Sequence, residues 1–292
     1  MNIFYGTGVA IVTPFQADGR VDFDALGRII EHLISGGVEY IVSLGTTGES
    51  ATLSKDEKKQ VWEFTAKTVN KRVALVAGIG GNNTAETVAE FKAFNIDGYD
   101  AILSASPHYN KPTQEGIYQH YKALAEVSPL PIILYNVPSR TGSSVSAETT
   151  VRLAKDFKNI IAIKEASGNF DLLNQLMRDK PEDFLVISGD DPITLQMMAM
   201  GAVGVISVTG NALPNKVSSM VRTCLTGDYK AAHAAHYDLI EFTRLMFTEG
   251  SPAGVKSALK TLGIAGDTVR LPLVGVSDTT AQNIKKQIEL IG

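Results

Sequence analysis

Short apolar segments alternate with longer amphipathic segments along most of the chain. The apolar segments are rich in β-branched residues, which is typical of buried strands in a parallel sheet. They predict strands at 9–12, 40–44, 73–77, 101–103, 132–135, 160–163, 184–187 and 204–207. Helical patterns lie between them, for example at 22–35, 54–70, 84–96 and 114–126. Strands that recur roughly every 20–30 residues are typical of repeated strand–helix units.

Eight such units in a row predict an α/β fold, namely a closed (β/α)8 or TIM barrel. An open, doubly wound sheet is the alternative, but no glycine-rich dinucleotide fingerprint follows the first strand. After the eighth strand, the pattern predicts helices at 213–226, 229–248, 252–262 and 279–290. We therefore expect a barrel core over 1–212 and a C-terminal helical extension over 213–292 that packs on the barrel.

The composition limits the partners of this 292-residue chain. Hydrophobic residues make up 44%, charged residues make up 20%, and the net charge is −4, as in an ordinary globular protein. The chain has no basic run, so we expect no nucleic-acid partner. No apolar stretch approaches the length of a membrane span, so we expect no membrane contact. Cys224 is the single cysteine, which excludes an intrachain disulfide and favours a cytoplasmic location.

Lys164 is the most informative candidate for chemistry, because it directly follows the apolar run 160–163. A lysine at the carboxyl end of a buried strand has its amine near a dry interior, and burial disfavours the charged ammonium form. A neutral amine can attack a carbonyl group and form a Schiff base. The alternative is a lysine that extends to the surface or pairs with a carboxylate.

Polar residues follow several other predicted strands, where a barrel of this type carries its reactive groups. Thr46 and Thr47 lie in a glycine-flanked loop in which hydroxyls and backbone N–H groups can converge on a carboxylate. Prolines bracket the loop that holds Tyr109, and Tyr135 ends the fifth strand, where its hydroxyl can pass protons. Arg140 offers a planar fork for a carboxylate. Helix caps, a buried tyrosine with a backbone partner and a solvated arginine are the structural alternatives.

Two adjacent aspartates, Asp190 and Asp191, follow the seventh strand and invite a metal interpretation. We expect no metal site, because no further carboxylate or histidine sits at the neighbouring strand ends and the five histidines do not cluster. The two aspartates are expected to cap the next helix, which opens at Pro192.

Five motifs resemble, in order, those of the dihydrodipicolinate synthases, within the pyruvate-dependent class I aldolase superfamily. They are GTTGES at 45–50, SPHYNKP at 106–112, YNVPSRTG at 135–142, IKEASGN at 163–169 and SGDD at 188–191. The resemblance runs nearly end to end. The motif at 135–142 discriminates best, because the sialic acid lyase branch lacks the arginine of this loop. GTTGE and the lysine motif mark the superfamily only.

The resemblance implies a lyase of lysine and diaminopimelate biosynthesis, which condenses pyruvate with L-aspartate 4-semialdehyde and then cyclises the product. It implies that Lys164 forms a Schiff base with pyruvate, and that no metal or organic cofactor is needed. Tyr135, Thr46 and Tyr109 would form a proton relay, with Tyr109 entering from a neighbouring subunit. The implied assembly is a homotetramer built from tight dimers.

The resemblance also implies a set of substrate-binding residues. Thr47, together with Thr46, would hold the pyruvate carboxylate. Arg140 would receive the carboxylate of aspartate semialdehyde. Gly189 and Ile206 would line the pocket near the lysine.

A possible effector site departs from the family pattern. Lysine-inhibited relatives bind lysine with a histidine where this chain has Lys58 and a tyrosine where it has His108. The matching positions of that site are Ser50, Ala51, Asn82 and Glu86. Because a lysine ammonium would meet like charge at Lys58, we expect weak or absent inhibition by lysine.

Other activities remain as alternatives at this point. The first is another pyruvate-dependent aldolase, such as N-acetylneuraminate lyase or a 2-keto-3-deoxy-sugar-acid aldolase, against which Arg140 argues. The others are a non-enzymatic barrel that binds a keto acid and a pyridoxal phosphate enzyme that uses Lys164 as its internal aldimine.

Overall fold

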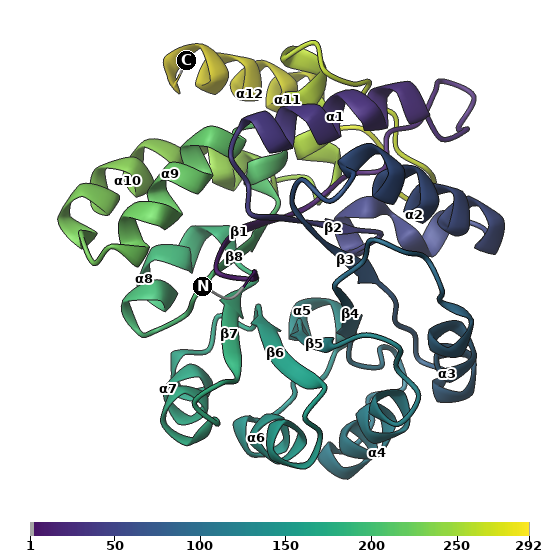
Figure 1. Ribbon diagram of the computed structural model, residues 1–292. Helices are drawn as coiled ribbons and strands as arrows, with labels where there is room; N and C mark the ends of the chain where they lie inside the picture. Colours follow the sequence, from purple (N-terminus) through teal and green to yellow (C-terminus); the bar gives the residue numbers. More distant parts are fainter. Residues whose placement is uncertain (1–2, 292) are drawn as a thin grey trace.

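The computed structural model describes residues 3–291 and confirms the closed barrel (Figure 1). Each strand pairs in parallel with the next along the chain, and the last strand pairs with the first. The strands are β1 (Gly6–Ala10), β2 (Tyr40–Ser43), β3 (Ala74–Gly78), β4 (Ala101–Ala105), β5 (Ile132–Asn136), β6 (Ile160–Glu165), β7 (Leu185–Ser188) and β8 (Gly204–Ser207).

Helices surround the strands (Figure 1). They are α1 (Phe23–Ser35), α2 (Lys55–Val69), α3 (Thr84–Ala93), α4 (Gln114–Ala125), α5 (Pro138–Thr141), α6 (Ala147–Asp156), α7 (Phe170–Asp179), α8 (Thr194–Ala199), α9 (Pro214–Leu225), α10 (Tyr229–Leu245), α11 (Ala253–Thr261) and α12 (Asp278–Ile291). The C-terminal helical extension is therefore present. The first helix after β8, α9, contacts β1, β8 and α1, and the C-terminal helix α12 packs on α10 and α11. The division of the chain at 212/213 stays a prediction.

All eight predicted strands are found, with end points that shift by a few residues. The largest consequence is at β6, which continues to Glu165, so that Lys164 lies inside the strand rather than after it. The reason is the ladder to β5, which pairs Tyr135 with Lys164 and Asn136 with Glu165. Backbone pairing continues beyond the apolar run. The hydrophobic pattern predicts only the apolar part of the strand.

Alternation along the strands decides what enters the barrel. Ala162 packs in the apolar cluster inside the barrel, whereas Ile163 packs in the larger cluster between sheet and helices. Because side chains alternate between the two faces of a strand, Lys164 is on the same face as Ala162 and enters the barrel.

None of the helices described for residues 3–291 combines the length and the apolar character that a bilayer crossing requires.

Candidate active site

Lys164 and Tyr135 form the centre of the site at the carboxyl ends of β5 and β6. Both are buried, with 5% and 6% of their surface exposed. The Nζ atom of Lys164 lies over the Tyr135 ring, 4.4 Å from its centroid. Apart from this ring, the Lys164 amine has no hydrogen-bond or ion-pair partner among residues 3–291. A buried lysine that is not paired with a carboxylate is rare, and is well suited to act as a nucleophile.

Gly189 lies beside this lysine, and Ile206 lies in the barrel interior. A Cβ atom added at Gly189 would come within 2.9 Å of both Cγ and Cε of Lys164, so glycine gives the lysine its room. The Gly189 N–H donates to the carbonyl of Glu165, which holds the two segments together at 2.8 Å. Ile206 is buried in the same interior cluster as Tyr135.

Asp191 does not cap the following helix, and the sequence prediction for it and for Asp190 is wrong. Neither side chain makes a capping hydrogen bond at the short 3-10 turn that begins at Asp191. The Asp191 carboxylate instead accepts from the Ser207 hydroxyl and from the N–H groups of Val208 and Thr209, the first at the end of β8 and the others just beyond it. Burial raises the pKa of Asp191, and these hydrogen bonds and the positive charge of Lys164 partly offset it. Asp191 thus ties the ends of two strands together near the lysine.

A second buried carboxylate fixes the loop that carries Arg140. Glu165 accepts a 2.8 Å hydrogen bond from the Asn136 side-chain amide, whose oxygen accepts from the Val145 N–H. Burial raises the pKa of Glu165, and its hydrogen bonds from Ser167 and Asn136 partly offset it. Glu165, which follows Lys164, and Asn136, which follows Tyr135, therefore hold the ends of β5 and β6 together. Asn136 also holds the loop at Val145.

The loop after β2 places the two threonines differently. A 3-10 turn, Thr46–Gly48, holds Thr47 buried and leaves Thr46 exposed. The Thr13 hydroxyl donates to the Gly48 carbonyl at 2.7 Å, which fixes the turn against the segment that follows β1. Thr46 is thus presented on the open side of the loop at the carboxyl end of the barrel.

Two predicted site residues point away from the protein body. Tyr109 is 88% exposed and has a φ of 72°, a conformation that is uncommon for a residue with a bulky side chain. Arg140 is exposed in α5. The structure therefore brings Lys164, Tyr135 and Gly189 together, places Ile206 in the same interior cluster as Tyr135, and leaves Tyr109 and Arg140 exposed.

The six possible effector residues occupy separate surface segments. Lys58 is half-buried in α2, and Glu86 is exposed in the first turn of α3. His108 is exposed in the loop after β4. The remaining three, Ser50, Ala51 and Asn82, are half-buried or exposed. Within residues 3–291, no hydrogen bond or ion pair joins any two of the six side chains.

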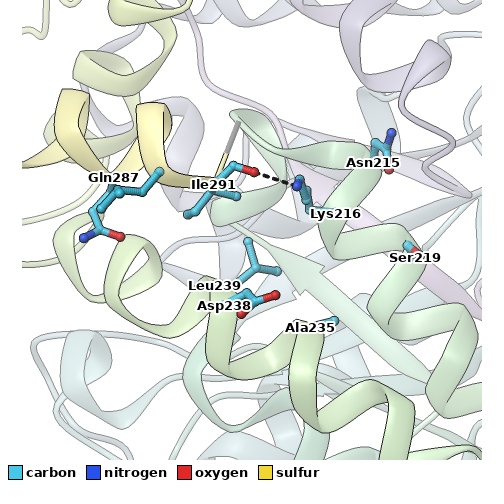
Figure 2. A pocket seen from close by; sticks show the side chains of 9 residues that line it. Asn215, Lys216, Ser219, Ala235, Asp238, Leu239, Gln287 and Ile291 are labelled. Atoms are coloured by element: carbon cyan, nitrogen blue, oxygen red, sulfur yellow. Dashed lines mark hydrogen bonds between the residues drawn. The ribbon is translucent and has the colours of Figure 1, made fainter.

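A separate cleft of about 690 Å³ lies between α9, α10 and α12 (Figure 2). Lys216 reaches across it and donates to the Ile291 carbonyl at 2.7 Å. The cleft contains none of the site residues that the sequence predicts. In the part of the chain that the structure describes, no group of three or more His, Cys, Asp or Glu side chains is placed to hold a metal ion.

The supporting residues were not predicted from the sequence. Asn136, Glu165 and Glu49 had no predicted role, although all three lie inside the family motifs. Lys256, which is fully buried, had none either. A lysine within the small and apolar run of 253–259 was a usable signal, because such a neighbourhood indicates burial on all sides.

The chain has extensive similarity to known proteins. The model of the dihydrodipicolinate synthetase family matches residues 3–291. A 4-hydroxy-tetrahydrodipicolinate synthase from Flavobacterium psychrophilum is 53% identical over 97% of both chains. The crystal structure of a chloride-inhibited dihydrodipicolinate synthase from Acinetobacter baumannii, complexed with pyruvate, is 40% identical over 99% of both chains, with a TM-score of 0.95. A dihydrodipicolinate synthase from Cyanidioschyzon merolae with lysine bound is 34% identical, with a TM-score of 0.96, over 100% of this chain and 99% of that one. The chain belongs to the dihydrodipicolinate synthetase family.

Proposed function

We propose that the protein is a 4-hydroxy-tetrahydrodipicolinate synthase in which Lys164 forms the Schiff base with pyruvate. The observation that carries this assignment is the buried Lys164 amine, which has the Tyr135 ring beneath it and, among residues 3–291, no carboxylate within hydrogen-bond or ion-pair distance. A structural lysine would be paired, as Lys256 is with Glu49. Family membership and the 53% sequence identity to the Flavobacterium psychrophilum synthase favour this synthase over the sugar-acid aldolases.

The reaction follows from the chemistry of the amine. Lys164 attacks the ketone carbon of pyruvate, and loss of water gives a protonated imine. The imine accepts the electron pair that is left when a methyl proton departs, which yields an enamine. The enamine carbon attacks the aldehyde of aspartate semialdehyde, and the amine of that substrate closes the ring onto the imine carbon and releases Lys164. The lysine supplies the electrophilic centre, so the route needs no metal or organic cofactor.

The remaining residues have roles in binding and proton transfer in this proposal. Tyr135, Thr46 and Tyr109 form the relay that moves the methyl proton. Thr47 and the loop backbone bind the pyruvate carboxylate, and Arg140 at the rim binds the carboxylate of the second substrate. Gly189 and Ile206 shape the space around the imine.

We also propose that the active unit is at least a dimer, within a homotetramer, and that it works in the cytoplasm. The exposure of Tyr109 supports the first part, because a relay residue that points away from its own subunit can serve a neighbouring one. The buried free thiol of Cys224 is consistent with a reducing compartment.

Borohydride reduction in the presence of pyruvate tests the assignment. We expect a pyruvate-derived adduct on the peptide that contains Lys164, detected by mass spectrometry, and none in Lys164→Ala. Aspartate semialdehyde should then be a far better acceptor than sugar aldehydes. Turnover without labelling of Lys164 would contradict the proposed chemistry.

A further inference from the structure

Lys256 is the other lysine buried in the structure, and its surroundings differ from those of Lys164. It lies in α11 with no exposed surface. Its Nζ atom donates to a carboxylate oxygen of Glu49 and, at 2.8 Å, to the Thr268 carbonyl, and it lies 4.2 Å from the centroid of the Phe15 ring. An amine with these partners is not available as a nucleophile, so the residue must have another role.

Both carboxylate oxygens of Glu49 also accept hydrogen bonds. One of its carboxylate oxygens accepts from Lys256, and the other accepts from the Arg270 N–H at 3.0 Å. Its side chain is 1% exposed. Both oxygens are thus held by the C-terminal region, and Glu49 is not available as a proton acceptor for substrate.

The backbone of Glu49 belongs to the loop that carries the threonines. Its N–H donates to the Thr46 carbonyl at 3.1 Å, and its φ of 52° is left-handed, a conformation that costs free energy for a residue other than glycine. The loop begins at Leu44, which also has a positive φ, of 55°. A loop with two such residues keeps this shape only where the surroundings fix it.

Arg270 strengthens the attachment from the same side. Its guanidinium donates to the carbonyl of Thr52 at 2.8 Å and to the carboxylate of Glu57 in α2, and it lies 4.5 Å from the Phe15 ring. Residues 256–270 therefore hold both the end of the threonine loop and the start of the helix that follows it.

We infer that Lys256, Glu49 and Arg270 are positioning residues that fix the Thr46–Thr47 loop in the shape that receives the pyruvate carboxylate. The inference rests on the proposed function. A buried ion pair is weak evidence for stability, because desolvation of both charges offsets their attraction. The specific effect of this ion pair is geometric. It fixes the Glu49 carboxylate, and it thereby fixes the Glu49 backbone, three residues from Thr46. Burial lowers the pKa of Lys256 to about 8, with Glu49 opposing the shift, so the ammonium is still charged at pH 7.

The test measures how the labelling of Lys164 by pyruvate and borohydride depends on pyruvate concentration. The main variant is Glu49→Gln combined with Lys256→Met, which leaves neither partner as an unpaired buried charge. Lys260→Met is the matched control, because Lys260 lies in the same helix and forms an exposed pair with Asp267. We expect the double variant to need about tenfold more pyruvate, or more, for half-maximal labelling, because small misplacements of binding groups are costly. The control should keep the wild-type value.

A merely structural role would lower the amount of labelled protein and leave the half-maximal pyruvate concentration unchanged. A folded double variant with the wild-type concentration would therefore overturn the inference. If the double variant does not fold, Glu49→Asp keeps the charge and shortens the side chain. It should show the same shift, and a wild-type value there overturns the inference equally. Absence of labelling in the wild-type protein would instead contradict the proposed function.

Discussion

The Nζ atom of Lys164 lies 4.4 Å from the centroid of the Tyr135 ring, and the two residues are paired across neighbouring strands. The ring face attracts a cation, so it steadies both the ammonium and the protonated imine. In the proposed reaction, the hydroxyl at the edge of the same ring would transfer protons. One tyrosine would then support the lysine through its ring and the reaction through its oxygen.

Tyr135→Phe separates these two contributions. We expect kcat to fall about 100-fold or more, because loss of a positioned proton-transfer group has effects of this size. Labelling of Lys164 by pyruvate should persist, since the ring remains. Tyr40→Phe is the control: Tyr40 packs in the same barrel interior, and its hydroxyl makes only a 3.5 Å contact with the Val205 carbonyl. Equal losses in both variants would contradict a specific role for the Tyr135 hydroxyl.

Gly189→Ala should impair the lysine directly. The new Cβ would lie 2.8 Å from the Ala166 Cβ and 2.9 Å from two carbons of Lys164, so the lysine and the Ala166 segment must shift, and we expect labelling by pyruvate to slow by about tenfold or more. Steady-state kinetics and the labelling rate should fall together. Gly275→Ala, where an added Cβ meets nothing within 4 Å, should match the wild type. A fully active Gly189→Ala variant would show that the lysine tolerates displacement.

Subunit sharing of Tyr109 is tested by complementation. Tyr109→Phe is expected to lose at least about 100-fold in activity, given the usual effect of a proton-transfer group. Lys164→Ala is expected to lose at least as much, because no Schiff base can form. A hybrid dimer of the two, purified with two affinity tags, combines an intact Lys164 with the partner's intact tyrosine in one of its sites. We expect about half of the wild-type activity per hybrid. A hybrid no more active than its parents would place Tyr109 in the site of its own chain.

Inhibition by lysine should be weak. By the family resemblance, Lys58 would put a positive charge where the ammonium of lysine binds, and His108 would stand where inhibited relatives have a tyrosine. We expect no inhibition at micromolar lysine, a level that would require binding of roughly −8 kcal/mol. Lys58→His combined with His108→Tyr should lower the inhibitory concentration about tenfold, a change of about 1.4 kcal/mol. Strong inhibition of the wild-type enzyme would refute this expectation.

His120 makes stability depend on pH. It is buried in α4 beside Thr84, and burial lowers its pKa from 6.5 to about 4. The unfolded chain therefore binds a proton more readily, and the stabilisation that is present above pH 6.5 is lost as the pH falls toward 4. The loss is roughly 3 kcal/mol, given 1.36 kcal/mol per pKa unit. Urea unfolding at several pH values should show it, with a smaller dependence in His120→Phe and an unchanged one in the exposed His233→Gln.

Much of this protein was determined by local sequence. The eight apolar runs with amphipathic segments between them predicted the barrel, because strands and helices bury their faces with different periods. Lys164 and Tyr135 could be named because, in a parallel barrel, the carboxyl ends of all strands meet at one mouth. Gly189 and Ile206 were named from the family resemblance alone.

The tertiary structure decided what no local pattern contains. The bond between Glu49 and Lys256 joins residues 207 positions apart, and Asp191 turned from an expected helix cap into a link to the end of β8. Side-chain partners of this kind depend on which segments the closed fold brings together. In sequence, Lys164 in a buried strand and Lys256 in a buried helix look alike. They differ in the folded protein, because Lys256 forms an ion pair with a carboxylate and Lys164 does not.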